Sequence, residues 1–383
     1  MMYPKNMLTG KEIKMADLRI EKLAQTIIDY SVAVRKGDRV LINGSTVAEP
    51  LIKELYTRIL QAGGHPFLML SFPGTEELFF RYASDDQLKH VPKPLELIYE
   101  TYDVRIALLA ETNTKALSNV EPDKITMQRR ARTELMRTFM RRSAAKELRW
   151  NVAPFPTNAS AQDADMSLLE YEDFVYGACL PDMADPVGYW KKFSARQDKI
   201  VAWLKGKKEV HVKGNDTDLR LSVAGRVFEN CDGHFNMPDG EVFTGPVENS
   251  LNGHVFFSYP AIYGGREVTG VRLWFEGGKV VKATADKNEE YLIKTLDTDA
   301  GSRFVGEFAI GTNEGITRFT REILFDEKIS GSFHMALGAG YPETGSKNES
   351  AIHWDMICDL RDGGEIRVDD ELLYRNGKFV IDF

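Results

Sequence analysis

Apolar residues recur at helical spacing in the first part of the chain and at every second position in the last part. The helical spacing predicts amphipathic helices at residues 17–34 and 48–62, the second ending at Gly63-Gly64. Short continuous apolar runs predict buried strands at 37–44, 65–72 and 103–111. Because helices alternate with these strands, we expect parallel pairing with right-handed crossovers.

The pattern changes to period two from about residue 207. Gly277-Gly278 stands between two alternating segments and predicts a β-hairpin. One helix is expected at 288–296. Further strands are expected at 304–311, 332–338 and 351–360.

These patterns predict two domains of different class. Residues 1–205 are expected to form an α/β N-terminal domain with a partly parallel sheet. Residues 206–383 are expected to form an α+β C-terminal domain rich in antiparallel strands. The proline-containing segment 150–205 is interpreted as the hinge between them.

A single long basic helix is predicted at residues 126–149. Between Gln128 and Arg149 it carries eight basic and two acidic residues. Such a helix could bind anions or could present a solvated face. The solvated face is favoured, because the whole chain is acidic and only Phe139 could stack on a base.

Charge and composition restrict the partners. The net charge of −8 does not suit a protein that coats nucleic acid or anionic membrane. No apolar run approaches the ~20 residues of a membrane span, and no secretory signal precedes the first helix. The three cysteines are widely spaced, which favours a reducing compartment. We therefore expect a cytoplasmic protein with neither nucleic-acid nor membrane partners.

Polar residues within the apolar strands of the second half are the strongest candidates for chemistry. His353 and Asp355 are two residues apart, so a strand places both on one face. His334 and Glu307 each lie in an apolar run, where a buried polar group needs a partner. Glu241 opens another β-like segment, and Glu327 follows later in the chain in LFDEKISG (324–331). These nitrogen and oxygen ligands suit a dinuclear site for Zn, Co or Mn.

Other sequence motifs indicate different sites, but each of them is incomplete. Cys231 and His234 have a C-x-x-H spacing, but no second such pair accompanies them. The sequence lacks GxSxG and HExxH, and residues 340–347 resemble a P-loop without its GK[ST] ending. These absences argue against a nucleophile-elbow hydrolase and against a nucleotide-binding loop.

Four blocks in the second half together resemble the aminopeptidase T / aminopeptidase S family of dinuclear metallo-aminopeptidases. They are GEVFTGP (240–246), GEFAIGTN (306–313), FDEKISGSFHMALGAGYP (325–342) and IHWD (352–355). GDRVLINGS extends the resemblance into the first half. The stretch from Asp326-Glu327 to His334 is longer than in the family pattern.

The resemblance implies an aminopeptidase acting on peptides, a homodimer, and two divalent metal ions (Zn, Co or Mn) per subunit. It places the metal ligands at Glu241, Glu307, Glu327, His334, His353 and Asp355. It also places a catalytic tyrosine at Tyr341, whose phenol would stabilise the oxyanion. Glu241 and Glu307 are both candidates for the carboxylate that carries the proton to the leaving amine.

Two other functions stay open at this point. One is a dinuclear metal hydrolase of a phosphoester or cyclic amide, although few Lys or Arg residues lie near the ligand blocks. The other is a non-catalytic binding protein with a cleft between two domains. Such a protein has no need for carboxylates buried in strands.

Overall fold

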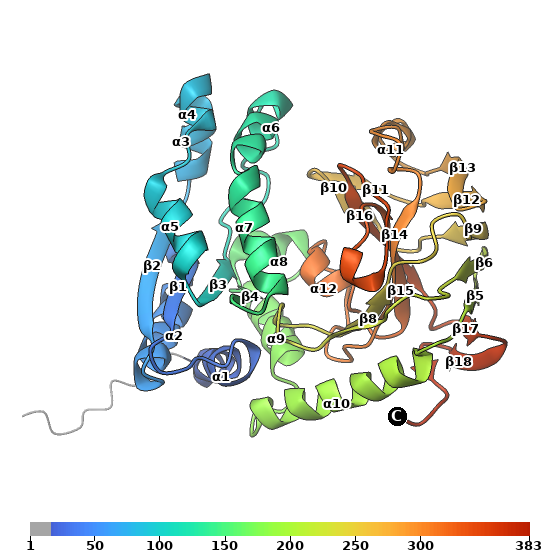
Figure 1. Cartoon of the computed structure of the whole chain (residues 1–383), viewed down its shortest axis with the longest axis horizontal. Coiled ribbons are helices and arrows are strands. Elements are labelled where there is room, and N and C mark those ends of the chain that lie inside the picture. The colour runs from blue at the N-terminus through green and yellow to red at the C-terminus, as the bar shows by residue number, and fades with distance from the viewer. Residues whose placement is uncertain (1–16) are drawn as a thin grey trace, which may run out of the picture.

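The computed structural model describes residues 17–383 (Figure 1). Its first half is built on a four-stranded sheet in the order β2-β1-β3-β4, with every pair parallel. The strands are β1 (Arg39–Ser45), β2 (His65–Ser71), β3 (Val104–Leu109) and β4 (Arg149–Pro154). This confirms the expected α/β class and adds a strand, β4, which the sequence pattern did not indicate.

Helices surround this sheet and connect its strands. The first predicted helix is observed as α1 followed by one π-helical turn at Ile27–Ser31. The helices of this half are α1 (Leu18–Thr26), α2 (Glu49–Gln61), α3 (Thr75–Tyr82), α4 (Asp85–Lys89), α5 (Lys93–Thr101), α6 (Pro122–Ala131), α7 (Thr133–Ala144), α8 (Asn158–Asp163), α9 (Leu168–Cys179) and α10 (Pro186–Leu204).

Three sequence expectations in this half need correction. The single basic helix is two helices, α6 and α7, interrupted at Arg132, and Lys146 in a left-handed conformation precedes β4. The apolar strand β2 is not buried, because it lies at the sheet edge with Phe67 45% exposed. The interpreted hinge contains β4 and α8–α10, whose apolar side chains pack into the core.

The second half contains two antiparallel sheets and a short hairpin, which confirms the expected class. One sheet has five strands in the order β16-β15-β14-β8-β7. They are β7 (Glu229–Cys231), β8 (Glu241–Thr244), β14 (Val305–Gly311), β15 (Ser332–Gly338) and β16 (His353–Asp359).

The other sheet has eight strands, in the order β13-β12-β9-β6-β5-β17-β18-β19. They are β5 (Glu209–Gly214), β6 (Thr217–Ser222), β9 (Asn252–Phe256), β12 (Arg272–Glu276), β13 (Lys279–Thr284), β17 (Glu365–Val368), β18 (Glu371–Arg375) and β19 (Lys378–Phe379). The hairpin β10 (Ala261–Tyr263) and β11 (Arg266–Val268) and the helices α11 (Glu289–Leu296) and α12 (Ile323–Asp326) complete this half. The predicted hairpin at Gly277-Gly278 joins β12 to β13.

Two hydrophobic cores organise the chain. The first joins the parallel sheet to its helices and also takes in Phe325 and Ile329 from the second half. The second lies between the five-stranded and eight-stranded sheets. Helix α10 runs along both halves (Figure 1), with Trp190 in the first core and Leu204 in the second. The domain boundary between residues 205 and 206 stays a prediction.

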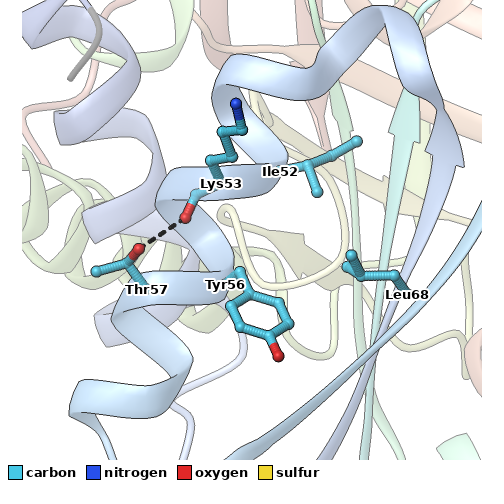
Figure 2. Close-up of a pocket in the computed structure, with 5 residues that line it drawn as sticks. All are labelled: Ile52, Lys53, Tyr56, Thr57 and Leu68. Atoms are coloured by element: carbon cyan, nitrogen blue, oxygen red, sulfur yellow. Dashed lines mark hydrogen bonds between the residues drawn. The ribbon is translucent and has the colours of Figure 1, made fainter.

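A pocket of about 340 Å³ lies between α2 and β2 (Figure 2). It is lined by Ile52, Lys53, Tyr56, Thr57 and Leu68. These side chains offer one ammonium, two hydroxyls and apolar surface, and none of them belongs to the site predicted from the sequence. Separately, no helix within residues 17–383 is long and apolar enough to cross a membrane.

Candidate metal centre

The alternation of the five-stranded sheet separates apolar from polar side chains. In β14, Phe308 and Ile310 face the core between the two sheets, which turns Glu307 to the opposite face. In β15, Phe333 and Met335 pack in that core and His334 takes the opposite face. The same parity turns Glu241 of β8 and both His353 and Asp355 of β16 to that face. Four strands thus contribute polar side chains to one face.

Each of these polar side chains has an alanine or glycine opposite it in one neighbouring strand, while His334 is also paired with Ile357 of β16 and Glu241 with Cys231 of β7. Glu307 and Asp355 both pair with Ala336, and His334 pairs with Ala309. The remaining two pairs are Glu241 with Gly311 and His353 with Gly338. Since directly opposed side chains in a sheet are close neighbours, an alanine or glycine there leaves room for carboxylates, imidazoles and a bound ion.

The carboxylates and imidazoles form a continuous chain of contacts. Nε2 of His334 lies 3.3 Å from Glu241 Oε2 and 3.7 Å from Glu307 Oε1. Nε2 of His353 lies 3.2 Å from Glu307 Oε2 and 3.5 Å from Asp355 Oδ1. Each oxygen of Glu307 therefore faces a different imidazole, which is the arrangement of a bridging carboxylate.

The six sequence-predicted ligands all lie in this cluster. Their ligand atoms fall into overlapping groups of three, within each of which all atoms lie within 4.8 Å of one another. The groups are Glu241–Glu307–His334, Glu307–His353–Asp355 and Glu327–His334–Asp355. Despite the longer stretch before His334, Glu327 comes from the end of α12 to join the strand residues.

Unpartnered oxygen atoms show that the cluster suits a cation. Glu241 Oε2 and Asp355 Oδ1 are buried without a hydrogen-bond partner. The imidazole nitrogens that lie 3.3 and 3.5 Å from these two oxygens do not form hydrogen bonds with them, and a buried carboxylate oxygen without a hydrogen bond is unfavourable. A divalent ion between these oxygens and the imidazole nitrogens would satisfy them, and the donor set fits Zn, Co or Mn.

A backbone carbonyl orients one of the two imidazoles. His353 Nδ1 lies 2.8 Å from the carbonyl oxygen of Ala339 and donates to it when it carries the proton. This leaves Nε2 directed at Glu307 and Asp355. Such an outer contact is the usual way in which a protein fixes the tautomer of a metal-binding histidine.

Burial and mutual contact shift the acidity of these groups strongly. Burial raises the pKa of the Glu241 carboxyl to about 8. Burial opposes protonation of the imidazoles, yet the neighbouring carboxylates raise the pKa of His334 to about 9 and that of His353 to about 12. Burial also acts against ionisation of Asp355, but His353 holds the pKa of that carboxyl at about 2. In the metal-free protein, protons therefore occupy places that a metal ion would take.

Tyr341 lies at the edge of the cluster, just after β15. Its ring packs edge-on against His353 and Phe243, with centroid distances of 5.3 Å to each. Burial and the nearby carboxylates raise the pKa of the phenol well above its usual range. Tyr341 is therefore a neutral hydrogen-bond donor beside the more exposed of the two imidazoles.

Two buried charged residues in the cluster were not indicated by the sequence pattern. Lys328 is 0% exposed, with its ammonium against Glu327 and 3.9 Å from Glu241 Oε1. Asp239 is also 0% exposed and accepts hydrogen bonds from the backbone N–H groups of Gly233 and Gly240. The sequence contained one indication of Lys328, which directly follows Glu327 in the block FDEKISGSFHMALGAGYP that resembles the family.

The C-x-x-H pair does not form a metal site. His234 contacts Asp232 at 2.6 Å, whereas the Cys231 sulfur groups with Asp239 and Glu241. His254 lies near Asp216, outside the cluster.

The fold and this cluster define a metalloenzyme with a buried centre of carboxylates and imidazoles. Residues 16–379 match the model of the thermophilic metalloprotease family, M29, and the chain belongs to that family. It is thus a metal-dependent peptidase by family, which confirms the resemblance seen in the sequence blocks.

Curated relatives match over nearly their whole length. Aminopeptidase T of Thermus thermophilus is 26% identical, with 94% of this chain and 95% of the relative covered. Aminopeptidase 2 of Geobacillus stearothermophilus is 24% identical, with 95% and 98% covered. Aminopeptidase AmpS of Bacillus subtilis is also 24% identical, with 94% and 98% covered.

Two solved structures share the fold. Wild-type AmpT from Thermus thermophilus superposes with a TM-score of 0.83 at 23% identity, covering 95% of this chain and 99% of the other. A 2,5-dihydroxypyridine dioxygenase from Pseudomonas putida KT2440 gives a TM-score of 0.59 at 12% identity, covering 96% and 99%. A peptidase and a dioxygenase on related folds show that the function must be argued from the site.

Proposed function

We propose that this chain is a metallo-aminopeptidase that removes the N-terminal residue from peptides at a centre of two divalent ions. The observation that carries the proposal is the buried cluster in which Glu307 faces both His334 and His353. Its relatives named aminopeptidase T, 2 and AmpS support the choice of bond.

The proposed ligands are Glu241, Glu307, Glu327, His334, His353 and Asp355. Divalent ions held there would polarise the scissile carbonyl and lower the pKa of a bound water. The nitrogen and oxygen ligands are compatible with Zn, Co or Mn. Glu307 fits the bridging position because its two oxygens face different imidazoles.

The peptide enters from the side of His353 and Glu327. The side chain of His353 is 29% exposed and that of Glu327 17%, whereas the side chain of His334 is 1% exposed. Asp355 and Glu327 are the more accessible carboxylates, so they provide the anionic surroundings that a free α-amine requires.

The Tyr341 phenol would donate a hydrogen bond to the carbonyl oxygen of the scissile peptide, where negative charge develops when water adds to the carbonyl carbon. Its neutral form and its place beside His353 suit this task. A carboxylate would take the proton that the attacking water loses and pass it to the leaving amine as the peptide C–N bond breaks. Glu241 and Glu307 are the candidates. A Glu241→Gln variant that keeps its metal but loses turnover would assign the role to Glu241, whereas full turnover in that variant would leave Glu307.

Two further features are proposed. Assembly as a homodimer rests on the resemblance to aminopeptidases T and S, and a cytoplasmic location rests on the three widely spaced cysteines. Light scattering coupled to size-exclusion chromatography tests the first, with twice the chain mass of 43.3 kDa expected.

The experiment for the proposed activity compares aminoacyl-arylamides, the same compounds with an acetylated α-amine, and nitrophenyl phosphate. We expect turnover of the free-amine substrates only, loss of turnover on chelation, and recovery on adding back Zn, Co or Mn. Preferred hydrolysis of the phosphate ester would favour another dinuclear hydrolase. Undiminished turnover after complete metal removal would contradict the proposal.

A further inference from the structure

Lys328 places a fully buried positive charge directly beside the metal centre. It is 0% exposed, and its ammonium contacts Glu327 and lies 3.9 Å from Glu241 Oε1. Asp239, which is also completely buried, has a carboxylate oxygen within 4.8 Å of a carboxylate oxygen of Glu241. An ammonium in such a place is stable only when anionic groups compensate its desolvation.

The backbone around Lys328 is fixed against the site. Asn313 N donates to Lys328 O at 3.1 Å, and Ser330 N donates to Asn313 O at 3.2 Å. The side chain of Asn313 donates to Asp239 O at 2.7 Å, so one residue ties the Lys328 segment to the Asp239 segment. A Cβ at Gly311 would stand 2.2 Å from Ile329 O, so glycine is required for this close approach.

A fourth group of potential ligands includes Cys231 of β7, the strand at the opposite end of the five-stranded sheet from β16. The Cys231 sulfur and carboxylate oxygens of Asp239 and Glu241 lie within 4.8 Å of one another. All three residues are buried. One thiolate and two carboxylates are ligands that zinc and cobalt accept.

We propose that Lys328 is a built-in cation that takes the place of a metal ion beside Glu241, in the group that Glu241 forms with Cys231 and Asp239, and so keeps divalent ions on the histidine side of the cluster. This rests on the proposed two-metal centre. Two divalent ions and one ammonium then balance the five carboxylates Asp239, Glu241, Glu307, Glu327 and Asp355. Lys328 acts as a positioning residue, because it directs Glu241 Oε2 to His334 while holding Oε1 itself.

The test is cobalt binding to the full chain, followed by metal analysis and by absorption spectroscopy. Wild-type protein should bind at most two cobalt ions per chain without thiolate-to-cobalt charge-transfer absorption. Lys328→Met keeps the length of the side chain and removes its charge. It should bind one more cobalt ion and gain the charge-transfer absorption, and the added Cys231→Ser change should remove both gains.

A matched control separates this effect from general loss of a lysine. Lys207 has a side chain that is 17% exposed and pairs with Glu371 at 2.9 Å, outside the cluster. Lys207→Met should therefore match wild type in cobalt content and spectrum. An unchanged cobalt count in Lys328→Met, with no thiolate absorption, would overturn the inference.

The wild-type protein provides an independent test should Lys328→Met fail to fold. Cys231→Ser alone should leave the cobalt count and spectrum unchanged, and a thiolate absorption already present in wild type would overturn the inference. Wild-type protein that binds no divalent ion would instead contradict the proposed function itself.

Discussion

The two antiparallel sheets share one core but differ on their outer faces. In the eight-stranded sheet, strands such as β6 and β17 alternate between buried and more exposed residues, as a sheet with one solvated face requires. In the five-stranded sheet, every residue of β14 and β15 is buried. There Glu307 and His334 occupy positions that an apolar residue would fill at lower free energy.

This difference between the outer faces distinguishes residues that stabilise the fold from residues that are suited to bind metal. The eight-stranded sheet places its charges in water, where ion pairs contribute little to stability. The five-stranded sheet buries its charges and leaves some of their oxygens unpartnered. Such an arrangement is unfavourable for folding alone, which is why we assign it to metal binding. Substitutions in the two sheets should therefore affect metal content and stability differently.

The largest effect is expected from Glu307→Gln, which keeps the shape and removes the bridging charge. Metal retention should be lost, and kcat/KM should fall about 10³-fold or more, since a metal supplies several kcal/mol of transition-state stabilisation. Metal analysis and arylamide kinetics measure both, and circular dichroism should show an intact fold. His353→Ala should show the same loss of metal and a similar fall in kcat/KM.

The matched control for Glu307→Gln lies in the other sheet. Glu365 of β17 has a side chain that is 27% exposed and pairs with Arg375 at 2.7 Å. Glu365→Gln should leave metal content unchanged and alter kcat/KM by less than about twofold. If both glutamine variants behaved alike, the distinction between the two sheets would be wrong.

A substitution in the core of the eight-stranded sheet should lower stability and leave metal binding unchanged. Leu273 of β12 is 0% exposed, so Leu273→Ala should lower the free energy of unfolding by about 2–5 kcal/mol. Denaturant unfolding measures this loss, while metal content per folded chain should stay at the wild-type value. Metal loss from the folded variant would show that the two sheets are not independent.

A smaller, purely catalytic effect is expected at Tyr341. Tyr341→Phe removes the phenol donor but keeps the ring that packs against His353 and Phe243. We expect kcat to fall about 10²-fold with KM and metal content nearly unchanged. Should metal be lost as well, Tyr341 would be part of the metal-binding structure rather than a donor to the oxyanion.

The smallest effect on stability is expected at Asp299, which lies between α11 and β14 and accepts hydrogen bonds from the loop that leads into β16. Although burial opposes it, hydrogen bonds from Ala351 N and the hydroxyls of Ser350 and Ser302 hold the pKa of Asp299 at about 2, below its ordinary value of 3.8. The folded state therefore gains stability above pH 4 and loses it as the pH falls towards 2.

Asp299→Asn tests this contribution. It should lower the free energy of unfolding by less than about 1 kcal/mol at pH 7, because the group is largely exposed. Unfolding curves of variant and wild type should converge near pH 2. A difference that stays constant with pH would mean that the Asp299 charge is not involved.

The sequence was sufficient to predict β14, β15 and β16 and to single out the six residues that meet in the cluster. The alternation in residues 351–360 places His353 and Asp355 on one face, and their Nε2 and Oδ1 atoms lie 3.5 Å apart. Glu307 and His334 were indicated by being polar within apolar strands. The fold class, the family and the metal-dependent peptidase class are confirmed, whereas the ligand roles of these residues stay a proposal.

Other features depend on tertiary contacts that no local pattern contains. The backbone of Lys328 and Ile329 approaches β14 so closely that a Cβ at Gly311 would stand 2.2 Å from Ile329 O. β2 is apolar yet exposed, because it lies at the sheet edge. The alanines and glycines opposite the ligands could be recognised only once the strand register was known, and the register of β14 and β15 includes an irregularity between Val305 and Glu307.

Anomalous diffraction from crystals grown with zinc or cobalt tests the assigned centre most directly. We predict two anomalous peaks about 3.5–4 Å apart, with Glu307 between them and with His334 and His353 on different ions. Peaks located elsewhere on the molecule, with none among these side chains in an enzyme that is active with that metal, would contradict the assignment.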